Sequence, residues 1–302
     1  MPEVPRDFYR TAFSRNLGLV SEDEQQTLRR SCVAVAGAGG VGGLHLLALT
    51  RMGVGKFHLA DFDTFEYTNF NRQFGAMVDT VGRKKIDVMK AMVQAINPEA
   101  EVVLFPEGVQ PDNVARFLSG TQAVVDGIDF FAFDHRRMLF NEARRAGLHV
   151  LTSGPVGWGA TLQIFSPTGM SFDEYFGMRD DMTEFEKFVA FAVGIAPAVL
   201  HRKYMDMSKI KVSAAQAPVV AAGCLLSSAL IATETTNVLL RRRPVKAVPH
   251  YFQFDMYLQV YRKRYLAFGA RNPLQALKRS ILRRTMKHLA GGQKLPGKLP
   301  GS

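Results

Sequence analysis

A glycine-rich stretch that follows a short apolar run is the strongest constraint on how this chain can fold. Residues 32–36 (CVAVA) lead directly into residues 37–43 (GAGGVGG), and an apolar stretch follows at 44–52. The short apolar run is typical of a parallel strand buried on both faces, and the later stretch predicts a helix. Glycines allow a tight turn and let a phosphate approach the positive end of that helix. A turn needed only for helix–sheet packing would use glycines in the same way. The pattern predicts a nucleotide-phosphate site at Gly37, Gly39, Gly40 and Gly42.

The rest of the chain alternates between short apolar runs and helical patterns. Residues 161–165 are expected to begin an antiparallel C-terminal continuation, and 170–210 are assigned only as helices and a loop that cap the sheet. The alternation predicts an α/β fold with a doubly wound, Rossmann-like, mostly parallel sheet. Further strands are expected at 56–60, 102–105, 123–125 and 150–152, and further helices at 21–30, 83–96, 112–118 and 134–146.

Asp61 ends the second expected strand, 24 residues after Gly37. An acidic residue at this place suits a ribose hydroxyl of a bound nucleotide. The glycines and this acid do not separate a dinucleotide oxidoreductase from an ATP-dependent enzyme. A P-loop NTPase is disfavoured because the sequence has no GxxxxGK[ST] element.

Charged and amide residues beyond Asp61 favour an enzyme that acts on ATP. The segment 61–73 reads DFDTFEYTNFNRQ, Lys85 follows it, and Asp129 comes after a later expected strand. A dinucleotide oxidoreductase has little use for this crowding. An enzyme that splits ATP between its α- and β-phosphates needs it, because Arg72 and Lys85 can neutralise the triphosphate and the leaving pyrophosphate. Asp129 can hold a Mg²⁺ ion that bridges phosphate oxygens.

At these residues the sequence resembles the ThiF/MoeB/HesA family, the bacterial relatives of ubiquitin-activating enzymes. The resemblance covers most of the chain, and its most specific motif is the D-x-D…N-x-x-R-Q element within 61–73. The other matching motifs are FSRN at 13–16, QQ at 25–26, GAGGVG at 37–42, Gly82 with Lys85, Asn97-Pro98, Asp126 with Asp129, Gly154 with Gly157, APVV at 217–220, Glu234 and FQFD at 252–255.

The resemblance implies adenylation. Members of this family activate a carboxylate, usually the C-terminus of a small β-grasp carrier protein, as an acyl-adenylate formed from ATP and Mg²⁺ with release of pyrophosphate. One subclass activates a carboxylate on a tRNA base, and this is the alternative substrate. Arg15 resembles an arginine that reaches into the partner's site in family dimers, which implies a homodimer.

The family's site residues map onto this sequence by position. Gly39 and Gly42 line the phosphates, Asp61 binds the ribose, and Asp63 belongs to the same site. The resemblance implies that the triphosphate is held by Asn69, Arg72 and Lys85, and the metal by Asp129.

The sequence departs from the family in its cysteines. Many relatives bind a structural zinc through two CxxC pairs, near 170–180 and after Asn272-Pro273, and this chain has neither pair. No zinc site is therefore expected. Cys32 and Cys224 are interpreted as buried packing residues, so the chemistry is expected to stop at the adenylate.

Two features near the expected site stay open at this stage. Either Arg136 or Arg137 could supply the arginine that relatives carry after the metal-binding aspartate. Trp158 follows Gly157 and either recognises a substrate or fills an apolar groove.

The positive charge of the chain is concentrated near its C-terminal end. The formal net charge is +11, but residues 241–302 contain 15 basic residues and one acidic residue, Asp255, so residues 1–240 are slightly acidic. A basic body that grips a polyanion is thus disfavoured. Residues 274–289 have the pattern of a basic amphipathic helix, for which docking on the protein itself, on an anionic membrane or on RNA are alternatives.

Two parts and a cytoplasmic location are expected. Residues 1–270 form the adenylation domain with its N-terminal helical arm, and 271–302 form the basic helix and a disordered tail.

Two cysteines and no apolar leader favour a reducing compartment. The apolar segment 212–240 contains Glu234 and is expected to be a buried helix and not a membrane span. An NAD- or flavin-dependent oxidoreductase and an inactive binding module are the alternatives outside this chemistry.

Overall fold

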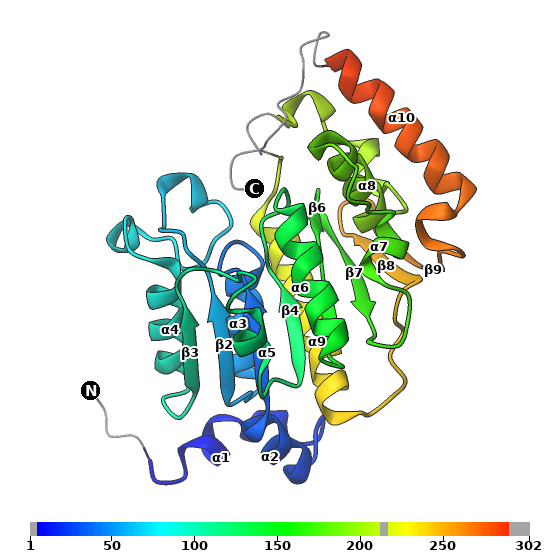
Figure 1. Ribbon diagram of the computed structural model, residues 1–302. Coiled ribbons are helices and arrows are strands. Elements are labelled where there is room, and N and C mark those ends of the chain that lie inside the picture. Colours follow the sequence, from blue (N-terminus) through cyan, green and yellow to red (C-terminus); the bar gives the residue numbers. More distant parts are fainter. Residues whose placement is uncertain (1–4, 212–216, 290–302) are drawn as a thin grey trace.

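The computed structural model describes residues 5–211 and 217–289. The expected disordered end at 291–302 and the segment 212–216 lie outside the described residues. Within them, nine strands form a sheet in the order β3-β2-β1-β4-β5-β7-β8-β9, with β6 paired to β7 (Figure 1). The strands are β1 Cys32–Ala36, β2 Lys56–Ala60, β3 Glu101–Phe105, β4 Ala123–Asp126, β5 His149–Thr152, β6 Pro155–Val156, β7 Gly159–Phe165, β8 His250–Asp255 and β9 Val260–Tyr265.

The sheet confirms the expected fold class. Strands β3, β2, β1, β4 and β5 are parallel, whereas β7, β8 and β9 continue the sheet in antiparallel fashion. Strand β1 pairs with β2 on one side and with β4 on the other. The connections that leave β1 and β4 therefore run in opposite directions, which opens a crevice at the carboxyl ends of these two strands.

The run CVAVA in β1 is apolar throughout because both faces of the sheet are covered. Val33 and Val35 belong to a core with α3, α4 and α9, whereas Ala34 and Ala36 belong to a second core with α5, α6, α7 and α8. The alanines thus face one core and the valines face the other. A parallel strand that is buried on both faces needs apolar residues at every position.

The helices form one layer on each face of the sheet, and α1 and α2 lie below the strands in Figure 1. A capping box begins α2, where Ser21 and Glu24 bond to each other's backbone amides. The α-helices are α1 Phe8–Ala12, α2 Glu22–Arg30, α3 Gly42–Arg51, α4 Lys85–Ile96, α5 Val114–Leu118, α6 Phe133–Arg145, α7 Phe172–Phe176, α8 Glu184–Ile195, α9 Ala221–Leu240 and α10 Pro273–Leu289. The 3-10 turns are η1 Ser14–Asn16, η2 Tyr67–Asn69, η3 Val78–Thr80, η4 Leu200–Lys203, η5 Met207–Lys209 and η7 Gly269–Arg271.

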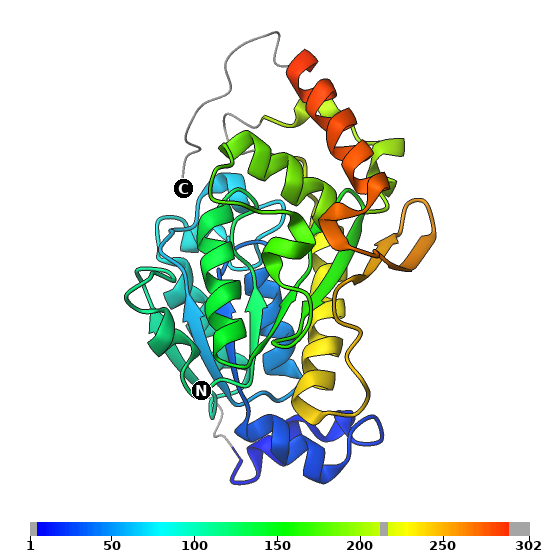
Figure 2. The same ribbon diagram turned by 45° about the vertical axis from the view of Figure 1, so that its right-hand side comes forward.

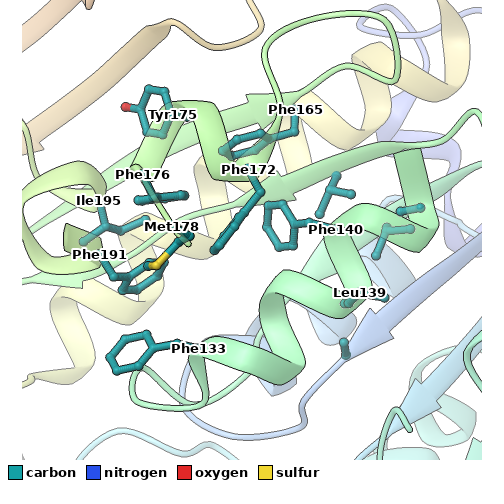
Figure 3. Packing of buried hydrophobic residues seen from close by; sticks show 14 of the residues in the cluster. Phe133, Leu139, Phe140, Phe165, Phe172, Tyr175, Phe176, Met178, Phe191 and Ile195 are labelled. Atoms are coloured by element: carbon teal, nitrogen blue, oxygen red, sulfur yellow. The ribbon is translucent and has the colours of Figure 1, made fainter. Parts of the chain in front are cut away.

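The region 170–210, which was expected to form helices and a loop that cap the sheet, contains α7 and α8 and packs through aromatic rings. Phe172 and Phe176 of α7 stand against Phe140 of α6, Phe165 of β7 and Phe191 of α8 (Figure 3). Each helix begins at a capping box, with Ser171 before α7 and Thr183 before α8. The cluster fixes these helices on the face of the sheet where α6 also packs.

Helix α9 runs along the other face and is the buried helix expected from the sequence. Among the described residues it alone is long and apolar enough to cross a membrane by those two criteria. It packs on α3 and β7, and two of its serines bond to neighbouring segments of the fold. The Ser228 hydroxyl donates to the Leu44 carbonyl at 2.8 Å, and the Ser227 hydroxyl donates to the Ser153 carbonyl at 3.0 Å.

The basic helix α10 docks on the protein's own surface, against α8 (Figure 2). Gln275 and Met286 are buried in the contact, and the Lys278 ammonium donates to the Pro197 carbonyl at 2.5 Å. Leu274 and Leu277 are exposed on the outer side. The side that faces the body is thus partly polar, contrary to the simple amphipathic pattern.

His45 in α3 generates a prediction about pH. It is fully buried, neither ring nitrogen has a hydrogen-bond partner among the described residues, and burial lowers its pKa to about 3. In the unfolded chain the His45 imidazole takes up a proton near pH 6.5, whereas in the folded chain it stays neutral down to about pH 3. The free energy of unfolding therefore falls as the pH drops from above 6.5 towards 3. Between pH 7.5 and 5.5 we expect His45 to account for a loss of about 1.4 kcal/mol in unfolding free energy. Urea denaturation of wild type and His45→Leu at both pH values checks this, and an equal loss in the two proteins would refute it.

Candidate active site

Two loops at the carboxyl ends of β1 and β4 touch backbone to backbone. A Cβ atom at Gly42 would lie 1.9 Å from the Gly37 carbonyl oxygen, and one at Gly37 would lie 2.2 Å from the Gly127 carbonyl oxygen. Gly37 also has a φ of +93°, which favours glycine. The glycines at 37, 42 and 127 are therefore required by the fold, as the packing interpretation of the motif proposes. They bring the loop after β4 against the amino end of α3.

Gly39 and Gly40 are different, because the fold leaves space beside them. A Cβ atom at Gly39 would have as its nearest neighbours side-chain atoms of Gln73, at 3.8–4.0 Å, and one at Gly40 would meet Arg72 at 3.3 Å. Gln73 is buried, and its Oε1 atom has no hydrogen-bond partner among the described residues. This loop therefore combines open space with the amino end of α3. A phosphate group fits such a cradle.

Asp61 lies beside the cradle at the end of β2. One carboxylate oxygen accepts from the Ala38 amide at 2.7 Å, and the other accepts from the Asp63 amide at 2.8 Å. Burial raises the pKa of Asp61, while the Lys85 ammonium and these two amides oppose the rise. The carboxylate keeps lone pairs that can accept from a ribose hydroxyl.

Lys85 begins α4 and is buried, and its ammonium pairs with the Asp63 carboxylate at 2.8 Å. This ion pair, in which Asp63 orients the lysine, is not apparent from the sequence. Lys85 is close enough to Asp61 to lower its pKa. A buried ammonium next to the glycine loop is well placed to attract phosphate charge.

Asn69 and Arg72 come from one turn, yet their surroundings differ. The side-chain Oδ1 atom of Asn69 accepts from the Glu66 backbone amide at 3.1 Å, so this side chain shapes the turn. Arg72 donates to the Thr68 carbonyl and to the Asn71 side chain, both at 2.9 Å. No carboxylate among the described residues pairs with Arg72 within 4.0 Å, so its charge beside Gly40 is available to an anion.

Asp129 is exposed on the loop that follows β4, two residues after Gly127. Its Oδ1 atom accepts from the Phe131 amide at 2.9 Å, while Oδ2 has no partner among the described residues. An exposed carboxylate oxygen is the kind of ligand that Mg²⁺ prefers. Asp129 thus fits the metal role that the resemblance implies.

Arg136 binds the carbonyl groups of this loop, which distinguishes it from Arg137. Its guanidinium pairs with buried Asp126 at 2.8 Å and donates to the carbonyls of Ile128 and Asp129 at 2.5 and 3.0 Å. Arg137 turns away and pairs with Asp173 at 2.7 Å. Arg136 is therefore the arginine that positions the Asp129 loop.

The structure does not bring Arg15 to the cradle of the same chain. Arg15 lies in η1, next to Asn16, whose side chain donates to the Met52 carbonyl beyond the carboxyl end of α3. The cradle lies at the amino end of α3. Ten residues of helix, about 15 Å, separate the two ends.

Both cysteines are buried, as expected. Burial raises the pKa of each thiol to about 11, so neither is a ready nucleophile at neutral pH. The sequence did not reveal that Cys224, on α9, lies close to Gly40 and Arg72. Trp158 is 45% exposed, and its backbone amide donates to Tyr204; its recognition role stays a prediction.

The two segments where relatives carry zinc ligands lie together in this fold. Gly177, Arg179 and Met182 from the first segment face Arg271 and Arg279 from the second across one cavity. Over the described part of the chain no group of three or more His, Cys, Asp or Glu residues could hold a metal ion.

The fold and the cradle define a Rossmann-like nucleotide-binding protein. Residues 13–275 match the ThiF family, and the chain belongs to that family. A tRNA threonylcarbamoyladenosine dehydratase from Bacillus subtilis is 40% identical over 122 residues, which are 40% of this chain and 48% of that protein. A probable adenylyltransferase/sulfurtransferase MoeZ from Mycobacterium tuberculosis is 35% identical over 150 residues, 49% of this chain and 36% of that protein.

A solved structure supports the fold. The AMP complex of Escherichia coli TcdA, a tRNA N6-threonylcarbamoyladenosine dehydratase, has a TM-score of 0.58 at 22% identity and covers 80% of this chain and 98% of that chain. The chain spans about half the length of the B. subtilis relative, 48%, and about a third of MoeZ. The comparisons thus establish the family and the fold.

Substitutions at Gly39 and Gly42 separate a role in phosphate binding from a role in packing. Gly39→Ala should keep the stability of wild type, because the fold has room for the methyl group, but should weaken ATP binding at least tenfold by filling the cradle. Gly42→Ala should lose more than about 2 kcal/mol of unfolding free energy, because its Cβ meets backbone. Urea denaturation and titration with a fluorescent ATP analogue measure both. Full ATP affinity in Gly39→Ala would show that phosphates bind elsewhere.

Proposed function

We propose that this protein is an adenylating enzyme that uses ATP to activate a carboxylate, forming an acyl-adenylate and releasing pyrophosphate. One observation carries the proposal: a cationic arginine without a carboxylate partner and a buried lysine flank a glycine cradle that has room for phosphate. Family membership supports the same class of reaction. A dinucleotide oxidoreductase has no triphosphate for these cations to neutralise.

In this proposal each part of the cleft has a task. The amides around Gly39 and Gly40 hold the phosphates and Asp61 receives the ribose, as implied by the loop geometry. Arg72 and Lys85 neutralise the triphosphate and stabilise the leaving pyrophosphate. Asp129 would hold Mg²⁺, which supplies further neutralisation of phosphate charge when bound.

The chemistry needs alignment and charge stabilisation, without a nucleophile from this chain. A carboxylate oxygen of the substrate attacks the α-phosphorus, and the bond to the bridging oxygen of pyrophosphate breaks. Both thiols are buried with raised pKa values, which argues against a thioester on this chain. A separate nucleophile would then displace AMP from the adenylate.

For the substrate, we favour a carboxylate carried by a tRNA. The similarity to tRNA threonylcarbamoyladenosine dehydratases supports this choice. So does the edge strand β9, whose Arg262, Lys263 and Arg264 are exposed and can contact RNA phosphates. The C-terminus of a small ubiquitin-like or sulfur-carrier protein is the second candidate, which the similarity to MoeZ favours.

A homodimer and a cytoplasmic location belong to the same proposal. Arg15 is held about one helix length from the cradle of its own chain. It can act on ATP only from a second copy. Cross-linking of a cysteine introduced at Arg15 to the cradle of a differently tagged copy would test this arrangement.

Exchange of labelled pyrophosphate into ATP tests the activity. With bulk tRNA, Mg²⁺ and ATP, wild type should catalyse exchange, and Arg72→Ala should lower its rate at least a hundredfold through lost pyrophosphate stabilisation. Arg51→Ala, at the far end of α3, is the matched control and should keep the wild-type rate.

The acceptor is tested in the same assay. Exchange that requires tRNA and disappears after ribonuclease treatment supports the tRNA substrate, whereas exchange that requires a carrier protein ending in Gly-Gly supports the second candidate. Undiminished exchange in Arg72→Ala would contradict the role of this arginine.

A further inference from the structure

A second basic site lies far along the sheet from the nucleotide cradle. A cavity of about 230 Å³ opens between the segment joining α7 to α8 and the segment formed by η7 and α10. Arg179, Arg271, Arg279 and Arg283 line it together with one carboxylate, that of Glu186. None of these residues belongs to the cradle, and β1 and β4, which carry the cradle, are not among the elements that form the cavity (Figure 1).

The arginines of this cavity outnumber the carboxylates that line it. Among the described residues no carboxylate lies within 4.0 Å of Arg271, Arg279 or Arg283. Arg179 pairs with Asp181 at 3.0 Å. The Glu186 carboxylate accepts from the backbone amide and the hydroxyl of Thr183, both at 3.0 Å, and so caps α8, and its charge also interacts with Arg283 and Arg179.

Arg279 is held in place despite this imbalance. Its guanidinium is half-buried and donates to the Ala270 carbonyl at 2.6 Å. Burial lowers the pKa of Arg279, and the neighbouring charge of Arg283 lowers it further. Two guanidinium groups close together in a partly desolvated place repel each other unless an anion lies between them.

The walls of the cavity strengthen its attraction for anions. Met182, Val189 and Ala190 provide an apolar side opposite the arginines. Apolar walls exclude water and lower the local dielectric constant, which strengthens charge-assisted hydrogen bonds. Guanidinium groups also match the geometry of phosphate oxygens, because two parallel N–H groups can bind two oxygens at once.

We propose that this cavity is a binding site for the phosphate dianion of a small phosphate monoester. The excess of arginines over carboxylates favours a ligand with more than one negative charge, which a monoester carries and the diester of a nucleic acid or most phospholipids does not. The volume leaves room for a phosphate and a small attached group. The site is independent of the adenylation proposal, since none of its residues belongs to the nucleotide cleft.

Thermal unfolding in inorganic phosphate tests the site. Against chloride at matched ionic strength, phosphate at 20 times its dissociation constant should raise the Tm of the full chain by roughly 3–5 °C. Arg283→Gln should lose this rise. Without phosphate its Tm should equal or exceed that of wild type, because removing one charge relieves repulsion at Arg279. Arg284→Gln, the exposed neighbour outside the cavity, is the matched control and should keep the rise.

Further arms separate this cavity from other sites and sources. Arg72→Ala should keep the phosphate-dependent rise; a rise that vanishes in Arg72→Ala and persists in Arg283→Gln would place the anion in the nucleotide cleft and overturn the proposal. Glycerol 3-phosphate should act like phosphate and dimethyl phosphate should not, and equal stabilisation by the diester would also overturn it. Sedimentation of wild type, but not of Arg283→Gln, with phosphatidate-containing vesicles would assign the monoester to a lipid; protein that stays in solution assigns it to a free metabolite.

Discussion

The contact between the backbones of Gly37, Gly42 and Gly127 is the constraint on which the functional architecture depends. A side chain at any of the three would push apart the loops after β1 and β4. Their contact brings the amino end of α3, Asp61 and the loop of Asp129 into one crevice. Gly37 and Gly42 of the motif are needed for packing, and in our proposal Gly39 is left for a phosphate.

Ion pairs inside the fold then set the loops around this crevice. Arg136, buried with Asp126, ties three carbonyls of the Asp129 loop to the end of β4. A buried pair of this kind is costly to break from one side, since the remaining charge loses its partner. Lys85 is held by Asp63 in a similar way. Ion pairs within the protein therefore set the position of Lys85 and of the Asp129 loop.

Local patterns predict the parts of the structure that local interactions determine. The segment 32–36 is a strand because a continuous apolar run suits a sheet that is covered on both faces. The start of α2 depends only on Ser21 and Glu24, which are three residues apart in the chain. The sequence cannot choose between Arg136 and Arg137, because the choice depends on Asp126 and Asp173, which are distant in the chain. For the same reason it does not show Asp63 paired with Lys85 or the arginine cavity beneath α10. The capping boxes at Ser171 and Thr183 were readable signals for α7 and α8.

The central claim is that the crevice directs attack at the α-phosphate of ATP. The products report this directly, because α-attack yields AMP and pyrophosphate whereas γ-attack yields ADP and phosphate. Phosphorus-31 NMR of ATP, Mg²⁺ and bulk tRNA incubated with the full chain should show AMP and pyrophosphate growing in equal amounts, with no growth in Arg72→Ala. Formation of ADP and inorganic phosphate by wild type, with no AMP, would contradict the account.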